Sequence, residues 1–170
     1  MIRKKKNQPS VVSAYVPAEL RRRIRARFAD CCAYCRTGES LTVAIFEIEH
    51  IVPRSVGGET VFEYLCLACP TCNRSKAPRQ IAAAPLTGQT VLLFHPQQQQ
   101  WEEHFAWNED ATEIIGLTLM GQVTIDALRM NRPQLIRRRR MWVKMGEHPP
   151  QLAWIDHGYR DITAGLAFMH

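Results

Sequence analysis

Near its beginning the chain carries apolar residues at helical spacing. Leu20, Ile24 and Phe28 recur every four residues and define one buried stripe. Pro17 precedes them, and proline is favoured in the first turn of a helix. The pattern predicts a basic N-terminal helix, preceded by a loose basic arm over residues 1–16. Arginines occupy the other faces of this helix, at positions 21, 22, 23, 25 and 27.

The pattern changes to that of strands in the next part of the chain. Residues 43–48 are mostly β-branched or apolar, and they predict a strand that ends at Glu49 and His50. Residues 65–67 predict a second short strand. Residues 70–76 predict a short helix, because a proline opens the segment and another proline follows it closely. The predicted order is strand, loop, strand, helix.

Strand and helix patterns alternate again in the second half of the chain. Strands are predicted at Val91–Phe94, Trp101–Trp107 and Ile114–Leu119, and helical spacing returns at Val123–Met130 and over residues 131–145. The fold class predicted from these elements is α+β. We divide the chain into a basic arm (1–16), a core domain (17–84), an α/β extension packed on that core (85–148) and a tail (149–170).

The last predicted helix carries four arginines in a row, at positions 137–140. Four consecutive helical residues point all round the helix, so they cannot all face one groove of a nucleic acid. We expect one or two of them to reach phosphates. The others are expected to be solvated or to pack on Trp142 through their aliphatic stems.

Composition and charge narrow the class of protein. A net charge of +6 and a pI of about 9.2 favour a polyanionic partner. A hydrophobic content of 46% is sufficient for a packed core, and no apolar run approaches the length of a membrane span. We expect a cytoplasmic protein without a secretory signal.

Two Cys-x-x-Cys pairs are the most specific signal in the chain. They consist of Cys32 with Cys35 and Cys69 with Cys72. Each pair can present two thiolates from one turn, and two such turns give the tetrahedral Cys₄ coordination of structural zinc. Disulfides, a redox Cys-x-x-Cys and buried unpaired thiols are the alternatives. Cys31 and Cys66 lie outside the pattern, although Cys31 could replace Cys32 as a ligand.

Between the cysteine pairs lies a second group of residues with metal-binding and acid–base chemistry. Glu49 at the end of the first strand and Asn73 in the short helix are expected to face each other as oxygen ligands for Mg²⁺ or Mn²⁺. His50 would lie beside this ion. Imidazole titrates near neutral pH, so His50 can take a proton from water. Glu47 is a spare acid on the same strand face as Glu49, and a weaker candidate for a ligand.

The stretches CAYC, EHIVPRSVGG, LACPTC and CNRSK together resemble the HNH endonuclease family over about residues 32–76. The later segments LFHP, WEEHF and NRP look like the C-terminal extension of stand-alone bacterial HNH proteins, a looser likeness. The resemblance implies a ββα-metal (His-Me finger) core, clipped by the Cys₄ zinc. It also implies metal-dependent hydrolysis of phosphodiester bonds in double-stranded DNA with low sequence specificity.

The resemblance also assigns roles to single residues. His50 falls on the general base, Glu49 and Asn73 fall on the ligands of the catalytic metal, and Lys76 falls where a basic residue contacts phosphate. The family usually has Asn where this chain has Tyr64, and a Tyr hydroxyl or a backbone carbonyl would then have to hold the loop that orients His50. Nucleic-acid contacts are expected from Arg22, Arg25, Arg54, Arg74 and Lys76.

Two other classes of function stay open from the sequence. A zinc-stabilised nucleic-acid-binding module would have the same cysteines and the same positive charge, with the catalytic site silenced by the change at Tyr64. A redox or zinc-storage protein would neither bind nor cleave DNA. Metal-dependent nicking of a supercoiled plasmid distinguishes a nuclease from both.

Overall fold

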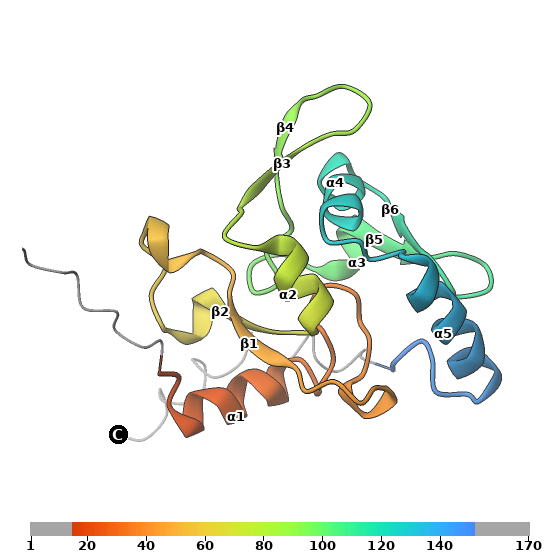
Figure 1. Ribbon diagram of the computed structural model, residues 1–170, viewed down its shortest axis with the longest axis horizontal. Helices are drawn as coiled ribbons and strands as arrows, with labels where there is room; N and C mark the ends of the chain where they lie inside the picture. The colour runs from red at the N-terminus through yellow and green to blue at the C-terminus, as the bar shows by residue number, and fades with distance from the viewer. Residues whose placement is uncertain (1–14, 152–170) are drawn as a thin grey trace, which may run out of the picture.

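A short antiparallel hairpin followed by a helix lies at the centre of the structure, a computed structural model that describes residues 15–151 (Figure 1). β1 (Glu47–His50) pairs with β2 (Leu65–Ala68), and α2 (Pro70–Lys76) follows after the single residue Cys69. The predicted order of strand, loop, strand and helix is confirmed. The two helices nearest the hairpin contact different strands: α2 packs against β1 and α1 packs against β2.

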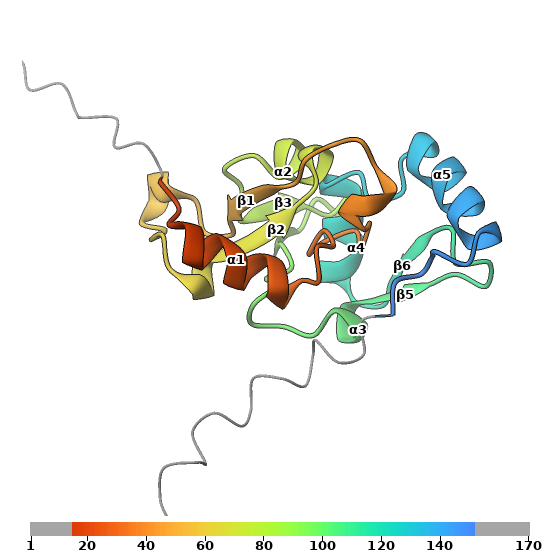
Figure 2. The same cartoon turned by 90° about the horizontal axis from the view of Figure 1, so that it is seen from below.

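The N-terminal basic helix is also confirmed. α1 (Ala18–Arg27) begins directly after Pro17, and its apolar stripe packs inward. Ile24 and Phe28 are buried, and Leu20 packs partly buried against the same core. The helix lies along the hairpin on the side away from α2 (Figure 2). Its arginine faces are left toward solvent.

The first predicted strand is wrong at its beginning. Residues 43–46 form no strand, and Val43 and Ile45 are largely exposed, at 106% and 81% of their reference areas. Side-chain oxygens satisfy this backbone in place of a neighbouring strand. The Thr42 hydroxyl accepts from the Ala44 N–H at 3.2 Å, and the Glu39 carboxylate accepts from the Phe46 N–H at 2.6 Å. The strand therefore begins only at residue 47.

The second half of the chain adds two hairpins and three helices around the core. β3 pairs with β4 and β5 pairs with β6, both antiparallel. Small antiparallel sheets mixed with helices give an α+β fold, as predicted. The elements are β3 (Ile81–Ala83), β4 (Thr90–Leu92), α3 (Trp101–His104), β5 (Phe105–Trp107), β6 (Ile114–Gly116), α4 (Leu119–Ala127) and α5 (Pro133–Lys144), with short 3₁₀ turns at Glu39–Leu41, Arg54–Val56 and Phe62–Tyr64.

Four predicted boundaries in this half are corrected by the structure. The segment predicted as one strand at 101–107 is a turn of helix followed by β5, because the Trp101 indole N–H is held by the Tyr34 carbonyl at 2.9 Å. β6 stops at Gly116, where a Cβ would lie 2.5 Å from the Gln122 nitrogen. Thr118 caps α4, which therefore starts at residue 119 and not at 123. The strand predicted at 91–94 is shifted, since β4 spans 90–92.

One hydrophobic cluster joins both halves of the described chain, and the buried Arg139 lies beside it. The cluster includes Leu67 from the hairpin and Phe105 from the extension. The Arg139 side chain is fully buried and lies over the Trp107 ring at 4.9 Å. Its guanidinium donates to the carbonyl oxygens of Cys35 and Thr112, both at 3.2 Å. The expectation of solvated or phosphate-bound arginines at 137–140 is therefore wrong for Arg139, which ties α5 to the first cysteine pair.

The segments predicted at the two ends lie largely outside the described residues. Of the predicted arm only residues 15 and 16 are described, and of the predicted tail only 149–151. Within residues 15–151, no helix has the length and apolar character needed to cross a membrane.

Candidate functional site

Four cysteine sulfurs converge at the junction of the hairpin and α2. The Sγ atoms of Cys32, Cys35, Cys69 and Cys72 all lie within 4.8 Å of one another, and all four residues are buried. The Cys35 and Cys69 sulfurs are 3.9 Å apart. A tetrahedral zinc ion with Zn–S bonds of about 2.3 Å requires sulfurs about 3.8 Å apart, so this donor set fits zinc.

The local chain explains how each cysteine pair is placed. Cys69 caps α2, and its sulfur accepts from the Cys72 N–H at 3.5 Å. The first pair is attached to the hairpin, because the Ala33 N–H donates to the Leu67 carbonyl at 2.8 Å. All six cysteines are free thiols, and Cys31 and Cys66 lie outside the cluster as expected.

The cluster also favours a thiolate. Hydrogen bonds from Cys32, Cys69 and Cys72 lower the pKa of Cys35 well below its ordinary value. Metal ligation requires deprotonated cysteines, and zinc holds them in that form. The buried guanidinium of Arg139 lies against the Cys35 carbonyl and supplies a positive charge beside this group.

Glu49 points into the protein from the middle of the hairpin. Its side chain is only 6% exposed. One carboxylate oxygen is 2.6 Å from the Lys76 Nζ, and the other accepts from the Tyr34 hydroxyl at 2.9 Å. Cys66, the cross-strand neighbour of Glu49, approaches the second oxygen at 3.5 Å. Burial raises the pKa of Glu49, and the charge of Lys76 acts in the opposite direction.

Asn73 meets a different acid from the one predicted. Its side-chain amide donates to Glu47, on the exposed edge of the site. Glu47 and Glu49 share one face of β1 because strand residues alternate, and Asn73 and Lys76 share one face of α2 because they are three residues apart. The two pairs therefore lie side by side between β1 and α2, with Asn73 opposite Glu47 and Lys76 opposite Glu49.

The predicted phosphate contact of Lys76 does not match its position. The residue is 1% exposed, and besides Glu49 its ammonium group donates to the His50 carbonyl at 3.3 Å. A buried carboxylate needs a compensating charge, and the lysine of the facing helix provides it. In this arrangement Lys76 compensates the buried charge of Glu49 and binds the backbone of His50.

His50 ends β1 and is half-buried at the edge of the site. Its Nε2 lies 3.1 Å from the Thr60 hydroxyl oxygen. Burial lowers the pKa of His50, and the positive charges of Arg54 and Lys76 lower it further. These causes favour a neutral imidazole at neutral pH, the form that can accept a proton.

The segment from Cys32 to the end of this site matches one known family. A family model described as HNH endonuclease matches residues 32–79. We call residues 32–79, which are similar to this family, the HNH domain. No protein among the curated proteins and no solved structure matches the chain. The likeness to the family rests on the domain that contains the cysteine cluster, the hairpin and α2.

Within the HNH domain, Tyr64 stands where the family usually has Asn, and it is its backbone carbonyl that is hydrogen-bonded. The Tyr64 carbonyl accepts from the Ile51 N–H at 2.8 Å, directly after His50. Its hydroxyl makes no hydrogen bond to any residue of the described segment. This bond continues the pairing of β1 with β2, and whether the carbonyl also orients His50 stays a prediction.

Sequence reasoning missed the residues that hold the HNH side chains in place. Thr60 contacts the His50 ring from a loop without regular structure, and Tyr34 bonds Glu49 from between the first two cysteine ligands. Cys66 could have been found, because it is the cross-strand neighbour of Glu49. No local pattern marks Tyr34 or Thr60.

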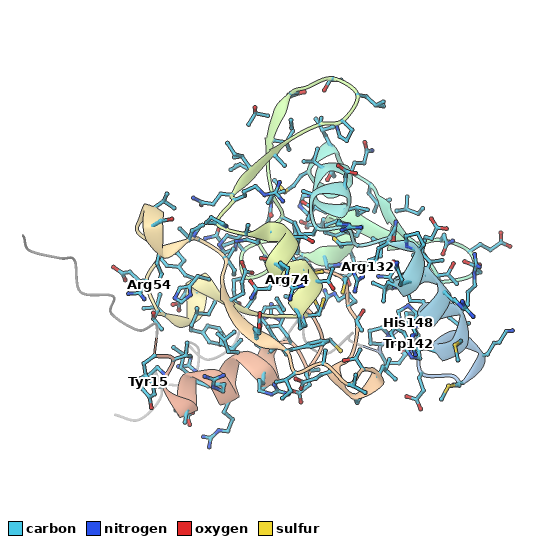
Figure 3. All side chains as sticks on the ribbon, viewed as in Figure 1. Tyr15, Arg54, Arg74, Arg132, Trp142 and His148 are labelled. Carbon is cyan, nitrogen blue, oxygen red and sulfur yellow. The ribbon has the colours of Figure 1, made fainter. Side chains whose placement is uncertain are left out.

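The arginines predicted to bind nucleic acid differ in their ion pairs and in their exposure to solvent. Arg25 is held by Asp30 at 2.7 Å and by Glu39, and Arg22 lies 2.5 Å from Glu19 in an exposed ion pair. Arg74 and Arg54 point outward from the HNH domain, on the face of the molecule where α2 lies (Figure 3). Arg54 and Arg74, like Arg22, are exposed, whereas Arg25 is partly buried by its ion pairs.

Proposed function

We propose that this protein is a divalent-metal-dependent endonuclease that hydrolyses phosphodiester bonds in double-stranded DNA with low sequence specificity. The observation that carries the proposal is His50, held by Thr60 at the end of the strand that also carries Glu47 and Glu49. The HNH domain and the net charge of +6 support a nucleic-acid substrate.

His50 is the general base of this proposal. Burial and two neighbouring positive charges favour its neutral form. Because Thr60 engages Nε2, the Nδ1 atom is the nitrogen left to take a proton from the attacking water. General base catalysis of this kind contributes about 10²–10⁴ in rate.

The divalent ion would be held by Glu49 and Asn73, with Glu47 as a third oxygen ligand beside Asn73. Carboxylate and amide oxygens are the ligands that Mg²⁺ and Mn²⁺ prefer. Glu49 is already paired with the Lys76 ammonium group, so the ion would have to displace that group from the carboxylate. When bound, the ion supplies charge neutralisation of the phosphate and the leaving oxygen.

The experiment is nicking of supercoiled plasmid in Mg²⁺ or Mn²⁺ by the wild type and by His50→Ala. We expect His50→Ala to lose at least about a hundredfold in rate. Its zinc content, unfolding midpoint and DNA affinity should stay at the wild-type values. Equal nicking by both proteins, purified in parallel, would remove His50 from the mechanism.

A specific observation favours the binding module as the second candidate. Both oxygens of Glu49 are engaged by protein groups, through Lys76, Tyr34 and Cys66. If these partners do not yield to a metal ion, the domain binds DNA without cutting it. Salt-sensitive DNA binding together with no nicking in either metal would establish this alternative.

A further inference from the structure

A groove runs between the HNH domain and the C-terminal helix, outside the site described above. Its walls are the loop 37–46, the first turn of α2 and the side of α5, and its volume is about 470 Å³. This volume is within the range of about 300–1,000 Å³ found for sites that enclose small ligands.

One wall of the groove is cationic. Arg132 and Arg138 line it from α5, and Arg138 is exposed. The α5 segment contains no acidic residue. Among residues 15–151, neither arginine makes an ion pair, and the one side-chain hydrogen bond that either makes is from Arg132 to the Arg129 carbonyl. Glu39, in the loop opposite, is already neutralised by Arg25.

The opposite wall is apolar and unusually exposed. Leu41, Val43 and Ala44 line it, and the side chain of Val43 has no protein cover at all. An apolar wall facing a cationic one matches the two surfaces of an unpaired nucleotide, whose base is largely apolar on its faces and whose phosphate is anionic.

The groove also leads to the candidate metal ligands. Phe46 lines the groove and is followed in the chain by Glu47. Pro70 and Thr71 line it as well, and they open the helix that carries Asn73. The bonded pair of Glu47 and Asn73 therefore follows these lining residues in the chain, by one position after Phe46 and by two after Thr71. Arg132 and Arg74 appear on the same face of the molecule (Figure 3).

We propose that this groove binds an unpaired segment of nucleic acid next to the bond to be cut. Phosphates contact Arg132 and Arg138, and the sugars and bases lie against the apolar wall at Val43. The inference rests on the proposed nuclease function and adds a substrate class to it: duplexes that end in a single-stranded flap or overhang.

The test compares binding of two fluorescent DNAs, a blunt duplex and the same duplex with a short single-stranded flap. The His50→Ala background keeps the DNA intact. The test variant is Arg132→Gln/Arg138→Gln, and the control is Arg137→Gln/Arg140→Gln, which removes the same charge from exposed positions of α5 that do not line the groove. Equal unfolding midpoints of the two double variants exclude loss of folding as the cause.

We expect the test variant to lose about tenfold in affinity for the flap DNA, and its salt slope to fall by roughly 1.4, about 0.7 for each lost phosphate contact. Its affinity for the blunt duplex should change no more than that of the control. Equal losses on both DNAs would overturn the assignment to an unpaired strand.

Two further outcomes would also overturn the inference. The first is flap affinity unchanged in the test variant. The second is a concentration-dependent dimer that Val43→Asp abolishes without any effect on flap binding, since a second copy of the chain would then cover the apolar wall. In both cases plasmid nicking that depends on His50 would leave the proposed function standing, whereas absence of nicking and of all DNA binding would remove the function itself.

Discussion

Replacing Lys76 tests whether Glu49 is a metal ligand. Lys76→Met keeps the aliphatic stem and removes the charge that compensates a carboxylate with 6% exposure. Leaving one member of a buried ion pair without its partner destabilises a protein by about 3–5 kcal/mol. We therefore expect the free energy of unfolding to fall by an amount in this range when no divalent ion is present.

Mn²⁺ should then recover part of this stability in the variant. An ion that binds only the folded state at a concentration of 100 times its Kd adds about 2.7 kcal/mol. In the wild type the ion must first displace the ammonium group of Lys76, so its effect there should be smaller. The assay is urea unfolding of both zinc-loaded proteins with and without Mn²⁺.

A double variant provides the control. In Glu49→Gln/Lys76→Met the buried charge is gone, so most of the stability should return and Mn²⁺ should have no effect. If Mn²⁺ shifts Lys76→Met and the double variant equally, the ion does not bind Glu49. The ligand assignment would then have to move to the exposed pair of Glu47 and Asn73.

Three shorter predictions concern other parts of the structure. Cys35→Ser should lose the zinc found by elemental analysis and much of the folding stability, because the binding energy of a structural ion is folding energy; full zinc content would contradict this. Thr60→Val should slow nicking by about ten- to a hundredfold through a misplaced His50 ring, with DNA affinity unchanged; an unaltered rate would mean that the hydroxyl does not orient it. His148, buried with a pKa of about 4 against an ordinary value of 6.5, stays neutral in the folded state, so the unfolded state takes up its proton first as the pH falls below 6.5. His148→Phe should therefore lose about 2 kcal/mol less stability than the wild type between pH 7.5 and pH 5; parallel curves would refute this.

The elements that the sequence predicted well are those specified by local pattern. The stripe of Leu20, Ile24 and Phe28 determines α1, and the Cys-x-x-Cys spacing brings the four sulfurs together wherever the two turns meet. The prolines around residues 70–76 define α2 in the same way. Each helix signal and each Cys-x-x-Cys turn acts over fewer than ten residues, although the meeting of the two cysteine pairs joins segments 34 positions apart.

What the sequence could not predict depends on how distant elements meet. The chain contains Glu47, Glu49, Asn73 and Lys76, but only the position of α2 along β1 decides which acid faces which partner. Apolar residues at 43–46 looked like a strand, yet no neighbouring strand is available to pair with them. In the same way, four consecutive arginines give no sign that Arg139 alone turns inward.

The hydrogen bonds of Arg139 determine how far the protein can be truncated at its C-terminal side. The matched HNH segment ends at residue 79, but the carbonyl of Cys35, inside the first cysteine pair, is held by a guanidinium 104 positions further on. A fragment that stops after α2 would contain every zinc ligand and every candidate catalytic residue, yet it would lack the charge buried beside the zinc cluster. We therefore expect a stable fragment of this protein to extend through α5, well beyond the end of the matched segment.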